Sequence, residues 1–180
     1  LEVRTPRLNR SGFFIDATGR VLTTADAVAQ CGRITLDTLT EATVTATDAA
    51  NGLAVLTPAT PLSPPAFAEF QLSPDRIGAE LAVSGYSYGD ALPAPVLTFG
   101  TLAATEGLDG QQGLKRLALT ALPGDVGGPV VDSTGAVLGI LLPPSDDKTR
   151  LLPEGVSFAA AGTTIAAALQ AQGITLTQSA

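Results

Sequence analysis

Short stretches in which apolar and polar residues alternate run along most of the chain, and turn-forming residues separate them. A period of two is typical of strands with one buried face. Many short strands divided by Gly, Pro, Asp and Asn favour antiparallel barrels or a sandwich. The pattern predicts some eleven strands, at residues 11–15, 20–24, 33–36, 42–47, 53–57, 80–84, 96–103, 115–120, 129–132, 136–141 and 155–160.

Helical periodicity is limited to two stretches. Residues 25–30 could make one turn, and residues 163–170 predict a closing helix because Ile165 and Leu169 share one face. The proline-rich residues 58–65 cannot join the interior of a sheet, since proline lacks a backbone donor. We therefore expect one domain over residues 1–180, made of two lobes (about 1–60 and 66–160) and a C-terminal helix at 163–170.

Composition narrows the possible functions. The 180 residues suit a single domain, and 45% of them are hydrophobic, enough for a sizeable interior. The formal net charge of −7 disfavours nucleic acid and anionic lipid surfaces as partners. No apolar run approaches the ~20 residues that span a bilayer, so we expect no membrane span.

Metal and cofactor chemistry has little support in the sequence. The chain has no histidine and a single cysteine, Cys31, which excludes an internal disulfide and is expected to act as a small buried residue. Carboxylates alone remain as metal ligands, and the spacing of Asp125 and Asp132 matches no known ligand loop. We therefore predict neither a metal nor a cofactor.

Two motifs near the N-terminus carry a resemblance to a known family. Ser-Gly-Phe-Phe-Ile at residues 11–15, followed by Gly-Arg-Val-Leu-Thr-Thr-Ala at residues 19–25, resembles the opening hairpin of trypsin-like serine proteases of the HtrA/Deg type. In that family the hairpin leads into a histidine that acts as general base. The matching position here is Asp26.

Later motifs follow in the family's order. Residues 47–56 resemble its Asp-Leu-Ala-Val-Leu strand, with Gly52 at the position of the acid that orients the base. Residues 122–131 are similar to its Gly-Asp-Ser-Gly-Gly-Pro motif, with Val126 at the position of the serine. The resemblance implies an all-β fold of two antiparallel six-stranded barrels with a C-terminal helix. It also implies that Asp26, Gly52 and Val126 meet between the barrels.

The residues at these three positions suggest that the catalytic triad is degenerate. Serine attack needs a base to accept the hydroxyl proton and a third group to orient that base. No histidine is present, and Val126 offers an isopropyl group instead of a hydroxyl. The prediction is an inactive homologue rather than an enzyme.

Four residues remain of the turn that forms the family's oxyanion hole: Gly124, Asp125, Gly127 and Gly128. Two interpretations of the glycines stay open. Tight packing of the turn requires glycine, or a pocket of backbone N–H groups still binds a carbonyl or carboxylate.

Three functions follow from the resemblance. The first is a pseudoprotease that holds a peptide or protein segment in the old substrate groove, as a scaffold module of a larger bacterial envelope protein. The second is a hydrolase that uses other residues, with Ser84, Ser87 or Ser133 as nucleophile and Lys115 or Lys148 as base. The third is a purely structural domain. Bacterial relatives of this type mostly work outside the cytoplasm, so a periplasmic or other extracytoplasmic location is expected.

Overall fold

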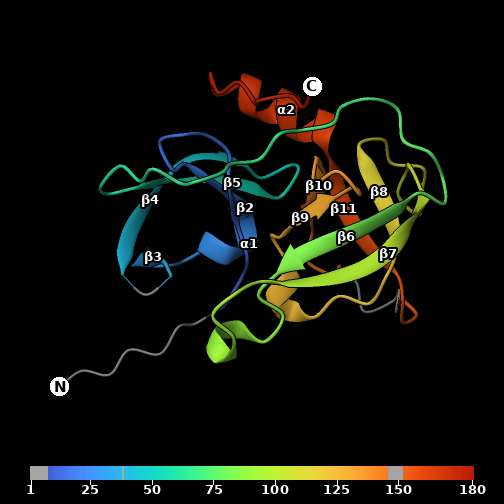
Figure 1. The fold of residues 1–180 in the computed structure, drawn as a ribbon, viewed down its shortest axis with the longest axis horizontal. Coiled ribbons are helices and arrows are strands. Elements are labelled where there is room, and N and C mark those ends of the chain that lie inside the picture. The colour runs from blue at the N-terminus through green and yellow to red at the C-terminus, as the bar shows by residue number, and fades with distance from the viewer. Residues whose placement is uncertain (1–7, 38, 146–151) are drawn as a thin grey trace.

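The first lobe is an open antiparallel sheet of five strands. A computed structural model describes residues 8–37, 39–145 and 152–180 of the protein. In this lobe the strands are ordered β1-β2-β5-β4-β3, so β1 and β3 are the edges (Figure 1). The strands are β1 Phe13–Phe14, β2 Val21–Thr24, β3 Ile34–Leu36, β4 Thr40–Asp48 and β5 Leu53–Pro58.

The second lobe is a closed antiparallel barrel of six strands in the order β10-β11-β8-β7-β6-β9. Alternate side chains point into the barrel, where Leu81, Val83 and Leu117 are almost fully buried. The strands are β6 Glu80–Gly85, β7 Val96–Ala104, β8 Leu114–Ala118, β9 Pro129–Val131, β10 Val137–Leu141 and β11 Ser157–Ala161.

Helices are few in the described residues. The α-helices are α1 Ala25–Val28 and α2 Gly162–Gln170, and the short 3₁₀ turns are η1 Gly89–Ala91 and η2 Pro123–Asp125. Helix α2 buries Ile165 and Leu169, the pair that its sequence pattern placed on one face. None of the helices in the described part of the chain has the length and apolar character needed to cross a membrane.

The predicted all-β class with a C-terminal helix is confirmed. The first lobe differs from the expected closed barrel of six strands, because its five strands leave two edges unpaired. The edge strands are too short to close it, since β1 has 2 residues and β3 has 3.

One continuous core joins the two lobes. The segment between β5 and β6 crosses from one lobe to the other, and its Phe70 is only 1% exposed (Figure 1). Phe70 packs in the same cluster as Ile15 of the first lobe, Ile140 of the barrel and Ile165 of α2. The segment thus contributes to the core as well as linking the lobes. Pro58, expected at the start of the linker, ends strand β5 instead.

A related turn closes one hairpin in each lobe. Asp16 accepts hydrogen bonds from the backbone N–H of Thr18 at 2.9 Å, and Asp132 accepts the equivalent bond from Thr134 at 2.8 Å. Burial acts to raise the pKa of both carboxyls, but hydrogen bonds outweigh it. Those from Thr18 and Arg20 to Asp16, and those from residues 134–136 to Asp132, hold each pKa below its ordinary value. Both turns therefore favour ionised carboxylates.

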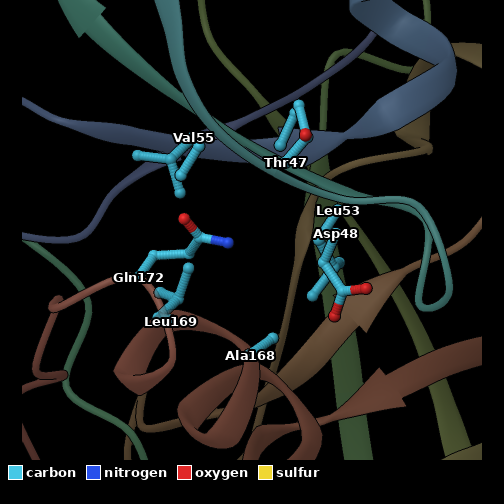
Figure 2. A pocket seen from close by; sticks show the side chains of 9 residues that line it. Thr47, Asp48, Leu53, Val55, Ala168, Leu169 and Gln172 are labelled. Carbon is cyan, nitrogen blue, oxygen red and sulfur yellow. The ribbon is translucent and has the colours of Figure 1, made fainter.

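Helix α2 packs against strands β4 and β5 and leaves a very small cavity. In Figure 2 the amide of Gln172 extends from the α2 side towards Val55, with Leu169 beside it. The cavity measures about 10 Å³, barely room for one water molecule, and its lining is largely apolar. We regard it as a packing gap rather than a ligand site.

Candidate functional site

Asp26 lies in the first turn of α1 and is held by an arginine from the N-terminal segment. The Arg10 guanidinium donates to Oδ2 of Asp26 from Nε at 3.2 Å and from Nη2 at 3.0 Å. The Thr24 hydroxyl donates to the other carboxylate oxygen, Oδ1, at 2.5 Å. Because Thr24 is fully buried, this hydroxyl supports the position of Asp26 and does not face a substrate.

Arg10 also reaches the turn that carries Val126. Its Nη1 donates to the carbonyl oxygen of Pro123, the first residue of η2, at 2.9 Å. The Arg10 side chain is 14% exposed, so much of this bridge lies away from solvent. One side chain thereby ties α1 of the first lobe to η2 of the second.

Gly52 has no side chain, and its backbone carbonyl connects the turn before β5 to α1. It has a φ of +70°, and its carbonyl oxygen accepts the N–H of Ala25 at 2.8 Å. The turn before β5 is thereby fixed to the start of α1, one residue from Asp26.

Ser11 fastens the N-terminal segment to the turn at residues 122–128. Its N–H donates to the carbonyl of Val126 at 2.8 Å, and its hydroxyl donates to the carbonyl of Gly124 at 2.7 Å. The same hydroxyl accepts the N–H of Tyr86 at 2.9 Å. Ser11 and Val126 are 4% and 3% exposed, so this contact is buried.

These contacts join the segments that carry Asp26, Gly52 and Val126 where the two lobes meet. We call this region the junction site, made of residues 10–11, 24–26, Gly52, 86–87 and 122–128. Long-range main-chain hydrogen bonds hold most of it, with Arg10 as its principal side-chain bridge.

Most backbone N–H groups of the turn donate within the chain. Asp125 donates to the carbonyl of Leu122 at 2.9 Å, and Val126 donates to that of Pro123 at 3.4 Å. Gly127 donates to Leu141 at 2.8 Å, and Gly128 donates to Asp125 at 2.9 Å. These bonds favour the packing interpretation of the glycines over a ready-made pocket of N–H donors.

The space around Gly124, Gly127 and Gly128 supports the same packing interpretation. A Cβ on Gly124 would lie 2.2 Å from the Tyr86 carbonyl oxygen, and one on Gly127 would lie 2.0 Å from that of Ser11. A Cβ on Gly128 would lie 2.3 Å from the carbonyl oxygen of Ser84. Backbone from two other segments, at Ser11 and at residues 84–86, occupies the space that side chains would need.

Asp125 lies within the turn, and its fully buried carboxylate accepts a hydrogen bond from a serine hydroxyl. Its Oδ1 accepts the hydroxyl of Ser87 at 2.5 Å, and its Oδ2 accepts the N–H of Leu122 at 2.9 Å. The sequence suggested Ser87 as a nucleophile with Lys115 or Lys148 as its base, whereas the structure pairs Ser87 with Asp125. The pairs Ser87–Asp125 and Arg10–Asp26 were both missed, since they join residues 38 and 16 positions apart through tertiary packing.

The other candidate residues lie apart from the junction site or have structural contacts. Ser133 lies within the Asp132 turn, and the buried Lys115 is paired with Asp75. Cys31 is partly buried and its Sγ contacts the carbonyl oxygen of Ala27 at 3.5 Å. Ser84 is half-buried on β6. Lys148 lies outside the described residues.

The described residues contain no cluster of candidate metal ligands. Within residues 8–37, 39–145 and 152–180, no group of three or more His, Cys, Asp or Glu side chains is placed to hold an ion.

Bacterial proteins of much greater length are similar to the chain in sequence. The chain is 33% identical over 144 residues to serine protease Rv3671c of Mycobacterium tuberculosis, covering 74% of this chain and 36% of that protein. It is 29% identical over 174 residues to the uncharacterized protein y4bJ of Sinorhizobium fredii, covering 91% of this chain and 27% of that one. The chain thus spans about a third or less of the curated relatives it matches.

Solved structures confirm the trypsin-like fold. The active form of the Rv3671c protease aligns with a TM-score of 0.74 and 25% identity, covering 96% of this chain and 77% of that one. A serine endoprotease of Yersinia pestis aligns with a TM-score of 0.73 and 20% identity, covering 92% of this chain and 57% of that one.

The prediction that the chain is an inactive homologue and not an enzyme is contradicted by these relatives and was wrong. Rv3671c is a serine protease and the Yersinia pestis protein is a serine endoprotease, and an active form of the Rv3671c protease is among the structures that match. The prediction rested on these three positions and on the absence of histidine from the sequence. Changes at Asp26, Gly52 and Val126 bear on one catalytic mechanism, and they do not exclude hydroxyl chemistry by other groups on the same backbone.

The family match covers most of the chain. Residues 10–140 match the family described as trypsin-like peptidase domain, a span that runs from Arg10 into strand β10. Fold, motif order and relatives agree with it. The chain belongs to the trypsin-like peptidase family.

Proposed function

We propose that this domain binds a peptide or protein segment at the junction site. The observation that supports it is a set of three exposed apolar side chains, one in the turn at residues 122–128 and two at the ends of η1. Tyr88, Leu92 and Leu122 are 59%, 45% and 39% exposed. We call these three side chains the apolar rim.

The apolar rim is tied to the turn through Asp125. Tyr88 follows Ser87, whose hydroxyl donates to Asp125, and the N–H of Leu122 donates to the same carboxylate. Tyr88 and Leu92 occupy the two ends of η1, as its N-cap and C-cap residues. Large apolar side chains held around a rigid turn are the kind of surface that anchors a ligand's side chains. The ligand we propose is an extended segment with apolar residues.

The resemblance of the opening hairpin also supports a proposal for the cellular location of the domain and for its parent protein. Residues 11–15 and 19–25 support an HtrA/Deg-type domain, and with it an extracytoplasmic location within a larger bacterial envelope protein. The great length of the relatives agrees with a module of a larger chain.

A display screen tests the binding proposal. Peptides selected on the intact chain should lose affinity about tenfold or more for Leu122→Asp and Tyr88→Ser, since anchor residues dominate such interfaces. Phe99→Ser is the matched control, because Phe99 is 75% exposed on the barrel strand β7 outside the apolar rim. Equal losses in all three variants, or no selected peptides, would contradict the proposal.

A second candidate function is hydrolysis of the bound segment by Ser87. The contact that favours it is the bond of 2.5 Å from the Ser87 hydroxyl to the buried carboxylate of Asp125. In this scheme Ser87 Oγ attacks the carbonyl carbon of the segment while its proton passes to Asp125. The carboxyl then returns the proton to the leaving amine, and water repeats the sequence to release the acyl group.

Labelling distinguishes the two candidates. A fluorophosphonate probe should modify Ser87 and should fail with Ser87→Ala, whereas Ser84→Ala on the neighbouring strand should leave labelling intact. Labelling that persists in Ser87→Ala, or none in the native chain, would exclude Ser87 as the nucleophile.

A further inference from the structure

A cavity of about 430 Å³ lies at the end of β8 away from the junction site. Its walls are residues 71–75 of the segment between the lobes, Thr105, residues 112–115 and residues 161–163. Strand β8 begins at Leu114 beside this cavity, and η2 follows the other end of the strand. The volume is within the range of small-molecule sites.

An ion pair lies in the wall of this cavity. Lys115 Nζ is 2.5 Å from Asp75 Oδ2, and the two side chains are only 6% and 15% exposed. Removing two charges from water is costly, and mutual attraction only partly offsets it. Neither the fold's catalytic turn nor the apolar rim uses this pair.

The walls around the pair are fixed by bonds to separate elements. Gln71 donates its N–H to Val137 at 2.9 Å, which anchors the segment that carries Asp75. On the opposite wall, the Gly113 carbonyl accepts the N–H of Ala161 and the hydroxyl of Thr164, each at 2.9 Å. The cavity is therefore preorganised, which lowers the cost of binding.

Because Lys115 and Asp75 already pair with each other, charge balance disfavours a ligand with a single charge. A ligand with only a carboxylate would compete with Asp75 for Lys115 and leave one buried negative charge unpaired. A ligand with only an ammonium would leave Lys115 unpaired in the same way, and unpaired buried charges are strongly unfavourable. A zwitterion keeps every charge paired, because its carboxylate faces Lys115 while its ammonium faces Asp75.

We propose that this cavity is a binding site for a small zwitterion of the α-amino-acid class. The site is independent of the peptide segment proposed for the junction site. Leu72 and Leu114 line the same cavity, so an apolar side chain on the ligand finds apolar contacts there.

Calorimetric titration of the intact chain with L-leucine tests the proposal. Saturable binding is expected with a dissociation constant on the order of 1 mM, as suits so small a ligand. Two probes each lack one charge: 4-methylpentanoate has no ammonium, and 3-methylbutylammonium has no carboxylate. Both should bind about tenfold or more weakly than L-leucine.

Variants locate the site and control for folding. Asp75→Asn and Lys115→Met should each weaken L-leucine binding about tenfold or more. The double variant Asp75→Leu with Lys115→Met replaces the pair by apolar groups, so it should keep the native circular dichroism while losing binding. Arg33→Met removes a charge from the exposed Arg33–Glu41 pair in the other lobe and should bind like the native chain.

Three results would overturn the proposal. The first is no saturable binding of L-leucine up to about 20 mM, well above the expected dissociation constant. The second is binding of either singly charged probe as tight as that of L-leucine. The third is undiminished binding of L-leucine by a folded double variant.

Discussion

Arg10 and Asp26 form a charged contact between the N-terminal segment and α1, with two guanidinium nitrogens on one carboxylate oxygen at 3.2 and 3.0 Å. The third nitrogen bonds to η2 in the other lobe. This arrangement makes Arg10 a structural bridge across the junction site, with Asp26 as its partner in the first lobe.

Arg10→Met should destabilise the protein by about 1–2 kcal/mol, because it removes charged hydrogen bonds from both lobes and leaves Asp26 with fewer partners. Urea denaturation measures the change. Arg33→Met is the control: both partners of the Arg33–Glu41 pair are 56% exposed, so its loss should cost less than about 1 kcal/mol. Equal effects would show that Arg10 does not bridge the lobes.

Gly127→Ala should be among the most damaging single changes in the chain. Its φ is +88°, and an added Cβ would lie 2.0 Å from the Ser11 carbonyl oxygen. Backbone strain and overpacking together should cost about 3 kcal/mol or more. Gly155→Ala has a similar φ of +80° but nothing within 4 Å, so it isolates the strain at about 1–2 kcal/mol. Thermal unfolding of both variants measures the difference, and equal losses would disprove the close contact with Ser11.

Stability should fall in acid through the two aspartate turns. The pKa of Asp132 in the folded state is lower than its ordinary value of 3.8, so the ionised carboxylate stabilises the fold above that pH. This contribution is lost as the pH falls through the lower folded pKa. Asp132→Asn should therefore melt below the native chain at pH about 7, with the gap closing at pH about 3.

The exposed Glu154→Gln serves as control for that comparison and should change the melting temperature little at either pH. A deficit of the same size at both pH values for Asp132→Asn would mean that the charge of Asp132 does not stabilise the turn.

Local sequence pattern predicted most secondary structure but not all of the topology. The helix predicted at residues 163–170 is α2, which has one further residue, Gly162. It was predictable because the spacing of Ile165 and Leu169 marks the buried face of a helix. Whether the first lobe closes depends on how far β1 and β3 extend, and alternation does not reveal this. Phe70 lay outside every predicted strand and helix, and only the tertiary structure shows it in the core.

The site was predicted only in part, for a related reason. Motif order identified the segments of Asp26 and Val126 because each has a local signature. Arg10, Ser87 and the Asp75–Lys115 pair have no such signature, since their partners come from distant segments. The structure was needed to find them.

Chemical-shift mapping of a selected peptide on the intact chain tests the central claim most directly. Binding at the junction site predicts that the largest backbone amide shifts fall on Tyr88, Leu92, Leu122 and Val126, since these residues surround or form the turn. Amides near Phe99 on β7 and in α2 should change little. A peptide that binds with its largest shifts on those two elements, and none along residues 122–128, would contradict the account.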